Sequence, residues 1–207
     1  EFAMYRNSIK PGRFVSAPMV AEPVNLFDMA PDADGAAAVI LTSAERAEDM
    51  VPHPIRIAGS AVATDTLALH DRADMLFLRA AHLSAHKAFA RAGIRSSDVN
   101  LFELHDSFTV ISALTLEATG FAERGEGWKM AQAGLIGLNG KLPISTFGGL
   151  KARGNPAGAT GVYQAVEATL QLRGAAGANQ VEGARIALIQ NLGGLGSTAI
   201  AHVLQAL

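Results

Sequence analysis

Residues 99–120 read VNLFELHDSFTVISALTLEATG and contain one complete passage from a buried strand into a helix. The apolar run Val99–Leu104 predicts a short strand. Ser107–Thr119 predicts a helix, and Gly120 supplies the residue at which it ends. A strand that runs directly into a helix is the repeating unit of layered α/β proteins, so this stretch decides the fold class.

The same alternation of strand and helix extends on both sides of this stretch. The residues 123–149 are rich in glycine and predict loops with one short helix near 128–133. Together the elements predict an α/β fold with a mixed sheet packed between helices. The further expected elements are a strand at Ile55–Val62, helices at Asp74–Ala92 and Asn155–Leu172, and strands at Ala184–Gln190 and Ser197–Leu204.

The N-terminal part of the chain has a different character. Residues 1–34 contain four prolines and no sustained period, which predicts an extended connector with one short amphipathic piece. The run DGAAAVILT at 34–42 predicts a strand buried on both faces. Ser43 and the charged residues after it predict a capped helix.

Composition excludes several classes of function. The 207 residues carry 17 Lys and Arg against 19 Asp and Glu, and this net charge of −2 argues against a nucleic-acid ligand. The hydrophobic share of 49% indicates a globular chain. The chain has no cysteine, which excludes disulfides, thiolate metal sites and a thiol nucleophile within it and favours a cytoplasmic setting. Its apolar runs are shorter than the roughly 18 residues of a membrane span.

His105 follows the predicted strand at 99–104, where functional groups of open α/β sheets face a crevice. Its imidazole could serve as an acid, a base or a hydrogen-bond donor. The alternative is that Asp106 or Ser107 caps the next helix and His105 is an ordinary surface residue.

Two glycine-rich stretches offer further candidates. Asn155 and Pro156 suit the start of a helix, but the five glycines of 148–161 also permit close approach of a carbonyl oxygen that acquires negative charge. Gly193 lies in the turn at 191–197, which is either a plain hairpin or a source of a backbone N–H that points into a site. His82 and His86 stand four residues apart, but Leu83 replaces the glutamate of the zinc-protease pattern, so we expect no metal.

In this order, the motifs resemble the C-terminal half of a thiolase, most closely the sterol-carrier-protein-like branch. The similarity runs from about Tyr5 to Leu207. It implies part of a five-layered α-β-α-β-α fold. Residues 1–33 then correspond to the tail of the loop domain, 34–52 to the last strand and helix of the N-terminal half, and 53–207 to the C-terminal thiolase domain.

The resemblance implies an acyltransferase that acts on acyl-CoA thioesters by Claisen condensation or thiolysis, with coenzyme A as substrate and no other cofactor. The nucleophilic cysteine belongs to the missing N-terminal half, so this chain alone should be inactive. The implied catalytic residues are His105, Asn155 and Gly193.

The sequence departs from the thiolase pattern at the expected site. Asn155 replaces the histidine of Gly-His-Pro, and Ser107 and Asn191 occupy the places of a second cysteine. The pair His105 and Asn155 is instead similar to the His and Asn of type III ketoacyl synthases and hydroxymethylglutaryl-CoA synthases.

Two other functions remain open from the sequence. One is a non-catalytic scaffold or lipid-binding subunit. The other is a thiolase-like retro-aldolase of steroid side-chain degradation, which uses tyrosine and for which Tyr163 is the candidate. The resemblance also implies the N-terminal thiolase half as a partner, self-association into dimers or tetramers, and an OB-fold partner in the aldolase case.

Overall fold

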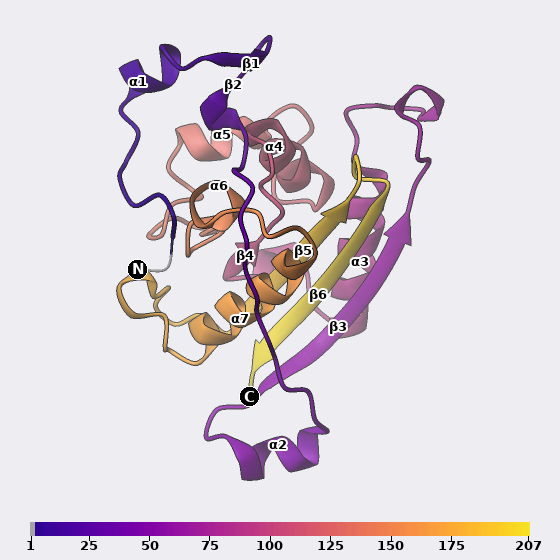
Figure 1. The fold of residues 1–207 in the computed structure, drawn as a ribbon. Helices are drawn as coiled ribbons and strands as arrows, with labels where there is room; N and C mark the ends of the chain where they lie inside the picture. Colours follow the sequence, from indigo (N-terminus) through magenta and orange to yellow (C-terminus); the bar gives the residue numbers. More distant parts are fainter. Residues whose placement is uncertain (1–2) are drawn as a thin grey trace.

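The centre of the molecule is a four-stranded mixed sheet in the order β3-β6-β5-β4 (Figure 1). The computed structural model describes residues 3–207. β4 runs parallel to β5, whereas β6 is antiparallel to both of its neighbours, β3 and β5. The strands are β3 (Ile55–Thr64), β4 (Leu101–Glu103), β5 (Ile186–Gly193) and β6 (Thr198–Ala206).

Helices cover both faces of this sheet, with α3 (Arg79–Ala92) behind it and α7 (Thr160–Leu172) in front of it in Figure 1. The side chains of β5 alternate accordingly: Leu188 packs in the cluster that contains α3 residues, and Ile189 packs with α7. The other helices are α1 (Pro11–Val15), α2 (Ala44–Met50), α4 (Thr109–Ala118), α5 (Gly127–Gln132) and α6 (Gly149–Arg153), and a short β1–β2 ribbon pairs Met19–Ala21 with Val24–Asn25. No helix of residues 3–207 is long and apolar enough to cross a bilayer.

The expected α/β class and mixed sheet are therefore confirmed, but two helices begin five residues later than the sequence predicts. The helix expected from Asp74 starts at Arg79, and the one expected from Asn155 starts at Thr160. In the second case Ala157 has a φ of 46°, which an α-helix cannot contain, so a 3₁₀ turn precedes α7. Helix α6 was missed because its glycines and short length indicate a loop.

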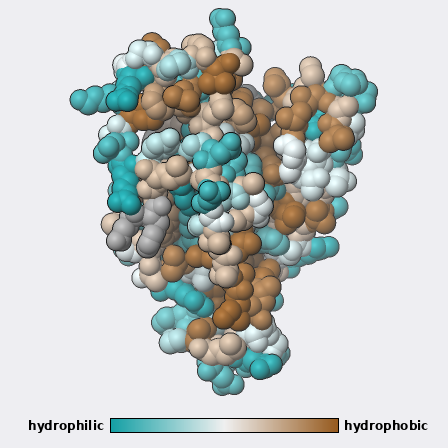
Figure 2. All heavy atoms as spheres, in the orientation of Figure 1, coloured by the Kyte–Doolittle hydropathy of each residue, from teal (hydrophilic) through white to brown (hydrophobic). Residues whose placement is uncertain are grey.

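The strand predicted at residues 34–42 is wrong. This segment is irregular and crosses in front of α7 and the sheet toward α2 (Figure 1). Ile40 and Leu41 are 84% and 72% exposed. Figure 2 shows hydrophobic surface in the lower part of the molecule, where this segment runs toward α2 in Figure 1. A lone strand needs a neighbour for its backbone groups, and no described strand pairs with this segment. The domain boundaries at 33 and 52 remain predictions.

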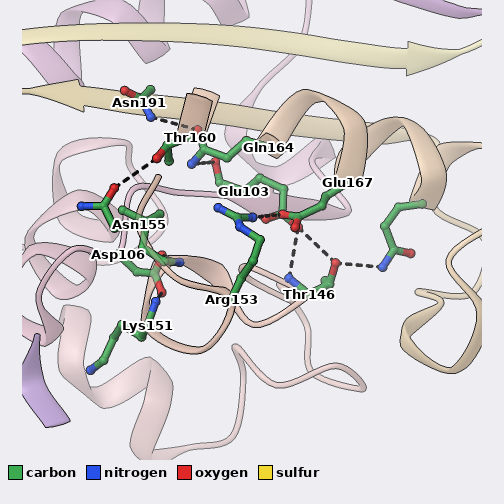
Figure 3. Close-up of polar contacts among 12 residues, drawn as sticks. Glu103, Asp106, Thr146, Lys151, Arg153, Asn155, Thr160, Gln164, Glu167 and Asn191 are labelled. Atoms are coloured by element: carbon green, nitrogen blue, oxygen red, sulfur yellow. Dashed lines mark hydrogen bonds and ion pairs between the residues drawn. The ribbon is translucent and has the colours of Figure 1, made fainter. Parts of the chain in front are cut away.

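Polar side chains are buried where β4, α6 and α7 meet (Figure 3). The carboxylate of Glu103 accepts hydrogen bonds from the backbone N–H and the hydroxyl of Thr146, both at 3.0 Å. Arg153 at the end of α6 forms a buried ion pair with Glu167 of α7. Each acid therefore has a hydrogen-bonding partner. This layer of buried polar side chains connects three elements without leaving either acid unpaired.

The two buried acids of this layer are not equivalent. Burial, together with the charge of Glu167, raises the pKa of Glu103 from its ordinary 4.5 to about 8. Burial also raises the pKa of Glu167, but the neighbouring Arg153 opposes this shift. Glu103 therefore holds the proton at neutral pH, and Glu167 is the anion that balances Arg153.

The close crossing of β3 and α3 at Gly59 should be intolerant of any side chain. A Cβ atom at residue 59 would lie 2.1 Å from the carbonyl oxygen of Ala88. We expect Gly59→Ala to lower the free energy of unfolding by about 1–3 kcal/mol or more, because sheet and helix must separate. Urea denaturation followed by circular dichroism measures this change. The control is Gly12→Ala, where no atom lies within 4 Å, and equal stability of the two variants would contradict the packing argument.

The protonated state of Glu103 predicts a pH dependence of stability. Between about pH 4.5 and pH 8, Glu103 keeps its proton in the folded chain but has released it in the unfolded chain. The free energy of unfolding therefore falls as the pH rises through this range. In Glu103→Gln this loss should be largely absent, because an amide does not ionise. Urea denaturation at pH values from 5 to 9 tests this, with the exposed Glu123→Gln as control. Parallel curves for the wild type and Glu103→Gln would refute the assignment.

Candidate functional site

The candidate site lies where the loop after β4, the end of β5 and the first turn of α7 converge. His105 follows β4 by two residues, and its Nδ1 lies 3.2 Å from Nδ2 of Asn191 on β5. The Asn191 amide also contacts Gln164 of α7 at 3.3 Å. Three elements that are distant in the sequence thus hold one half-buried imidazole.

Burial determines the charge of His105. Loss of solvent lowers its pKa from 6.5 to about 4, because the charged form is the one that burial disfavours. The imidazole is therefore neutral at pH 7, with one nitrogen that donates and one that accepts. A neutral donor of this kind can hydrogen-bond to a carbonyl oxygen without holding a full charge in the site.

Asn155 lies between α6 and α7, and its backbone is fixed by the N-terminal connector. Its N–H donates to the carbonyl of Pro31 at 2.8 Å, and its own carbonyl accepts from Ala33 at 3.2 Å. The side-chain Oδ1 accepts from the Thr160 hydroxyl and the Ala157 N–H, both at 3.2 Å. Among residues 3–207 the amide Nδ2 has no hydrogen-bond acceptor, so it remains available to a ligand.

The expectation that Asn155 caps the long helix is therefore wrong in detail. α7 begins five residues later, and the Asn155 side chain instead closes the turn that precedes it. The reason is the left-handed φ of Ala157, which separates Asn155 from the helix.

His105 and Asn155 are connected to the same end of α7 by different partners. His105 reaches it through Asn191 and Gln164, whereas Asn155 reaches it through Thr160. Figure 3 shows Asn155 and Asn191 beside the start of this helix. Within the described chain no hydrogen bond joins the His105 and Asn155 side chains, so their joint action on one ligand atom stays a prediction.

Asp106 performs a role that the sequence did not reveal. In the alternative interpretation of the sequence, it or Ser107 caps the following helix, but the N-cap of α4 is Phe108 without a side-chain bond. The Asp106 carboxylate instead accepts from the N–H of Leu150 at 2.8 Å and, more weakly, from that of Lys151 at 3.4 Å. It thus binds the start of α6 to the loop that carries His105.

A glycine makes this contact possible. Gly149 has a φ of 58°, and a Cβ atom there would lie 2.3 Å from Oδ2 of Asp106. Since Arg153 fixes the other end of α6 to Glu167, the short helix is held at both termini. Asn155 begins two residues after Arg153, so α6 determines its place relative to His105. The sequence signal for this short helix was the pair Gly148 and Gly149 followed by the basic residues Lys151 and Arg153.

Gly193 is the last residue of β5 and pairs with Thr198 across the hairpin. The hairpin interpretation is confirmed, with Gly194 and Gly196 at positive φ in the turn. Gly193 is exposed and follows Asn191 by two residues on the same strand. Its predicted contribution of an N–H to an oxyanion is not tested by this chain.

The other candidates lie apart from the His105 contacts. Tyr163 stacks on Arg153, whose Cζ is 4.9 Å from the ring centroid, and a Cβ at Gly35 would be 2.8 Å from its hydroxyl oxygen. Nδ1 of His82 lies 2.9 Å from the carbonyl of Ala118, and its ring packs against that of His86. The described residues contain no group of three His, Asp or Glu side chains placed to hold a metal.

Comparisons with known proteins identify the family of this chain. The family model described as "Thiolase C-terminal domain-like" matches residues 61–206. An acetyl-CoA acetyltransferase of Methanothermobacter thermautotrophicus is 44% identical over 189 residues, which are 91% of this chain and 49% of that protein. Sterol carrier protein 2 of Bos taurus is 34% identical over 175 residues, covering 82% of this chain and 32% of that protein.

A solved structure, the Ltp2-ChsH2(DUF35) aldolase, superposes with a TM-score of 0.85 at 25% identity and covers 96% of this chain and 51% of that chain. The chain thus spans about half the length of that structure and of the acetyltransferase, and about a third of the bovine relative. The matched domain begins within β3 and includes β4, β5 and β6, with the loop that carries His105. The chain belongs to the thiolase family and contains its C-terminal domain.

Proposed function

We propose that this chain supplies the C-terminal half of a thiolase-type acyltransferase, which acts on acyl-CoA thioesters by Claisen condensation or thiolysis. The observation that carries the proposal is the pair of available groups beside the first turn of α7, the neutral His105 imidazole and the free Asn155 amide. Such donors stabilise a carbonyl oxygen as it becomes negatively charged. Coenzyme A takes part as a portion of the substrate, and no further cofactor is proposed.

In the proposed reaction the thioester oxygen accepts hydrogen bonds from His105 and Asn155. Removal of a proton next to the carbonyl places negative charge on that oxygen, and preorganised donors lower the barrier to this step. The N–H of Gly193 is proposed to bind a second oxyanion together with the N–H of the nucleophile. The nucleophilic cysteine must come from another part of the protein, because this chain has none.

The N-terminal thiolase half is the proposed partner that provides this cysteine. Val62 and Ile200 are neighbours on β3 and β6. They are 60% and 41% exposed, on the part of the sheet's α7 side that α7 does not cover. The segment 34–42 carries further exposed apolar side chains, namely Val39, Ile40 and Leu41. An apolar sheet face of this kind is stable when a second layer packs on it. Self-association and an OB-fold partner are the further proposals that the family suggests.

A retro-aldolase is the second candidate, and the similarity to the solved aldolase over 96% of this chain favours it. In that case the Tyr163 hydroxyl is the proposed acid or base. Its position next to Gly35, away from His105, would then require a different substrate path.

Substitution of the two donors distinguishes these functions. With this chain and its N-terminal half assembled, we expect His105→Ala and Asn155→Ala each to reduce kcat for thiolysis or condensation by roughly 10²–10³-fold, because each removes one oxyanion donor. The exposed His53→Ala serves as control. Steady-state kinetics with acyl-CoA substrates measure the effect.

The opposite outcomes identify the alternatives. Unchanged turnover in both donor variants would overturn the proposed roles of His105 and Asn155. Retro-aldol cleavage that is lost in Tyr163→Phe would identify the aldolase instead. If the assembled wild-type protein processes no thioester and cleaves no aldol, a scaffold or lipid-binding subunit is the function that remains.

A further inference from the structure

A chain of hydrogen bonds leads from two backbone carbonyls of the sheet through Gln164 and Asn191 to His105. Figure 3 shows its link between Gln164 and Asn191. Gln164 is 1% exposed, and its Nε2 lies 3.2 Å from the carbonyl oxygens of both Glu103 and Gln190. Backbone carbonyl oxygens only accept hydrogen bonds. The NH₂ group of Gln164 must therefore face them, which directs its Oε1 toward Asn191.

The next bond in the chain fixes the orientation of a second amide. Oε1 of Gln164 is also only an acceptor, and it lies 3.3 Å from Nδ2 of Asn191. The Asn191 amide must present its NH₂ group on this side. The same nitrogen is 3.2 Å from Nδ1 of His105, so one hydrogen is directed to Gln164 and the other to the imidazole.

An NH₂ group that faces a ring nitrogen requires a lone pair on that nitrogen. We propose that Asn191 and Gln164 are positioning residues that hold neutral His105 in the tautomer protonated at Nε2. The opposite tautomer would point Nδ1–H of His105 at an N–H of Asn191 in a half-buried site, and residues 3–207 offer these two hydrogens no other acceptor. Nε2–H then becomes the donor that His105 presents to a ligand.

This inference gives a role to a residue that departs from the thiolase pattern. Asn191 stands where many thiolases are expected to have a second cysteine, and here it contacts His105 instead. The catalytic consequence rests on the proposed function, because only an oxyanion in the site makes use of an Nε2–H donor. The tautomer itself depends on this chain alone.

Nitrogen-15 NMR tests the tautomer directly. Two-bond proton–nitrogen correlations of the labelled full chain at pH 7.5 distinguish a protonated ring nitrogen from an unprotonated one, and His105→Gln identifies the His105 signals. We expect wild-type His105 to carry its proton on Nε2. Asn191→Asp replaces the donor by a carboxylate that only accepts, so we expect the proton to appear on Nδ1. Asn100→Asp is the matched control, because its Oδ1 already accepts from the N–H groups of Arg185 and Ile186.

The outcomes separate this proposal from the proposed function. A wild-type His105 protonated at Nδ1 would overturn the inference, and so would a His105 that stays protonated at Nε2 alone in Asn191→Asp. The wild-type spectrum decides alone if that variant does not fold. In the assembled enzyme, we expect Asn191→Asp to lower kcat at least tenfold with little change in KM, and an unchanged kcat would refute the positioning role. If the wild type has no acyltransferase activity, the proposed function fails while the spectra still decide the tautomer.

Discussion

The contact between the Asp106 carboxylate and the N-terminus of α6 is the constraint on which the arrangement of the site depends. It joins the loop after β4, which carries His105, to the segment that ends at Asn155. Asp106 and Leu150 are buried, so the carboxylate is not free to exchange the Leu150 N–H for water. Arg153 and Glu167 secure the far end of the same helix to α7. Together these bonds hold His105 and Asn155 at one corner of the sheet, although 50 residues separate them in the chain.

The regular elements of the fold could be predicted from the sequence because their signals are local. The apolar runs at β3, β5 and β6 and the glycines that end α3 and α7 indicate strands and helix ends without reference to the rest of the molecule. The failures have a common origin in tertiary context. Residues 34–42 have the composition of a buried strand, but a strand forms only where another backbone is available to pair with it. The late start of α7 depends on one dihedral angle, at Ala157, which no pattern predicts.

The candidate site shows the same division. Sequence motifs led to His105, Asn155 and Gly193, and the structure locates the first two at the same end of α7. The supporting residues were not predicted, because Asp106, Gln164 and Glu167 look like ordinary polar residues of a loop and a helix. Their roles follow from partners 14 to 61 positions away in the sequence. Long-range hydrogen bonds of this kind produce no periodic pattern in the sequence from which they could be predicted.

The left-handed backbone of Gly149 has a consequence for the evolution of this domain. Gly149 has no functional group, yet its replacement is as restricted as that of Asp106. Any side chain at residue 149 would occupy the space of the Asp106 carboxylate. Homologous domains that lose this glycine must also change the acid or the course of the backbone between the sheet and α6. Divergence at this corner is therefore possible only by coordinated replacement, whereas the glycines of the open turns at 125 and 134 are restricted by their own left-handed backbone and not by any neighbouring side chain.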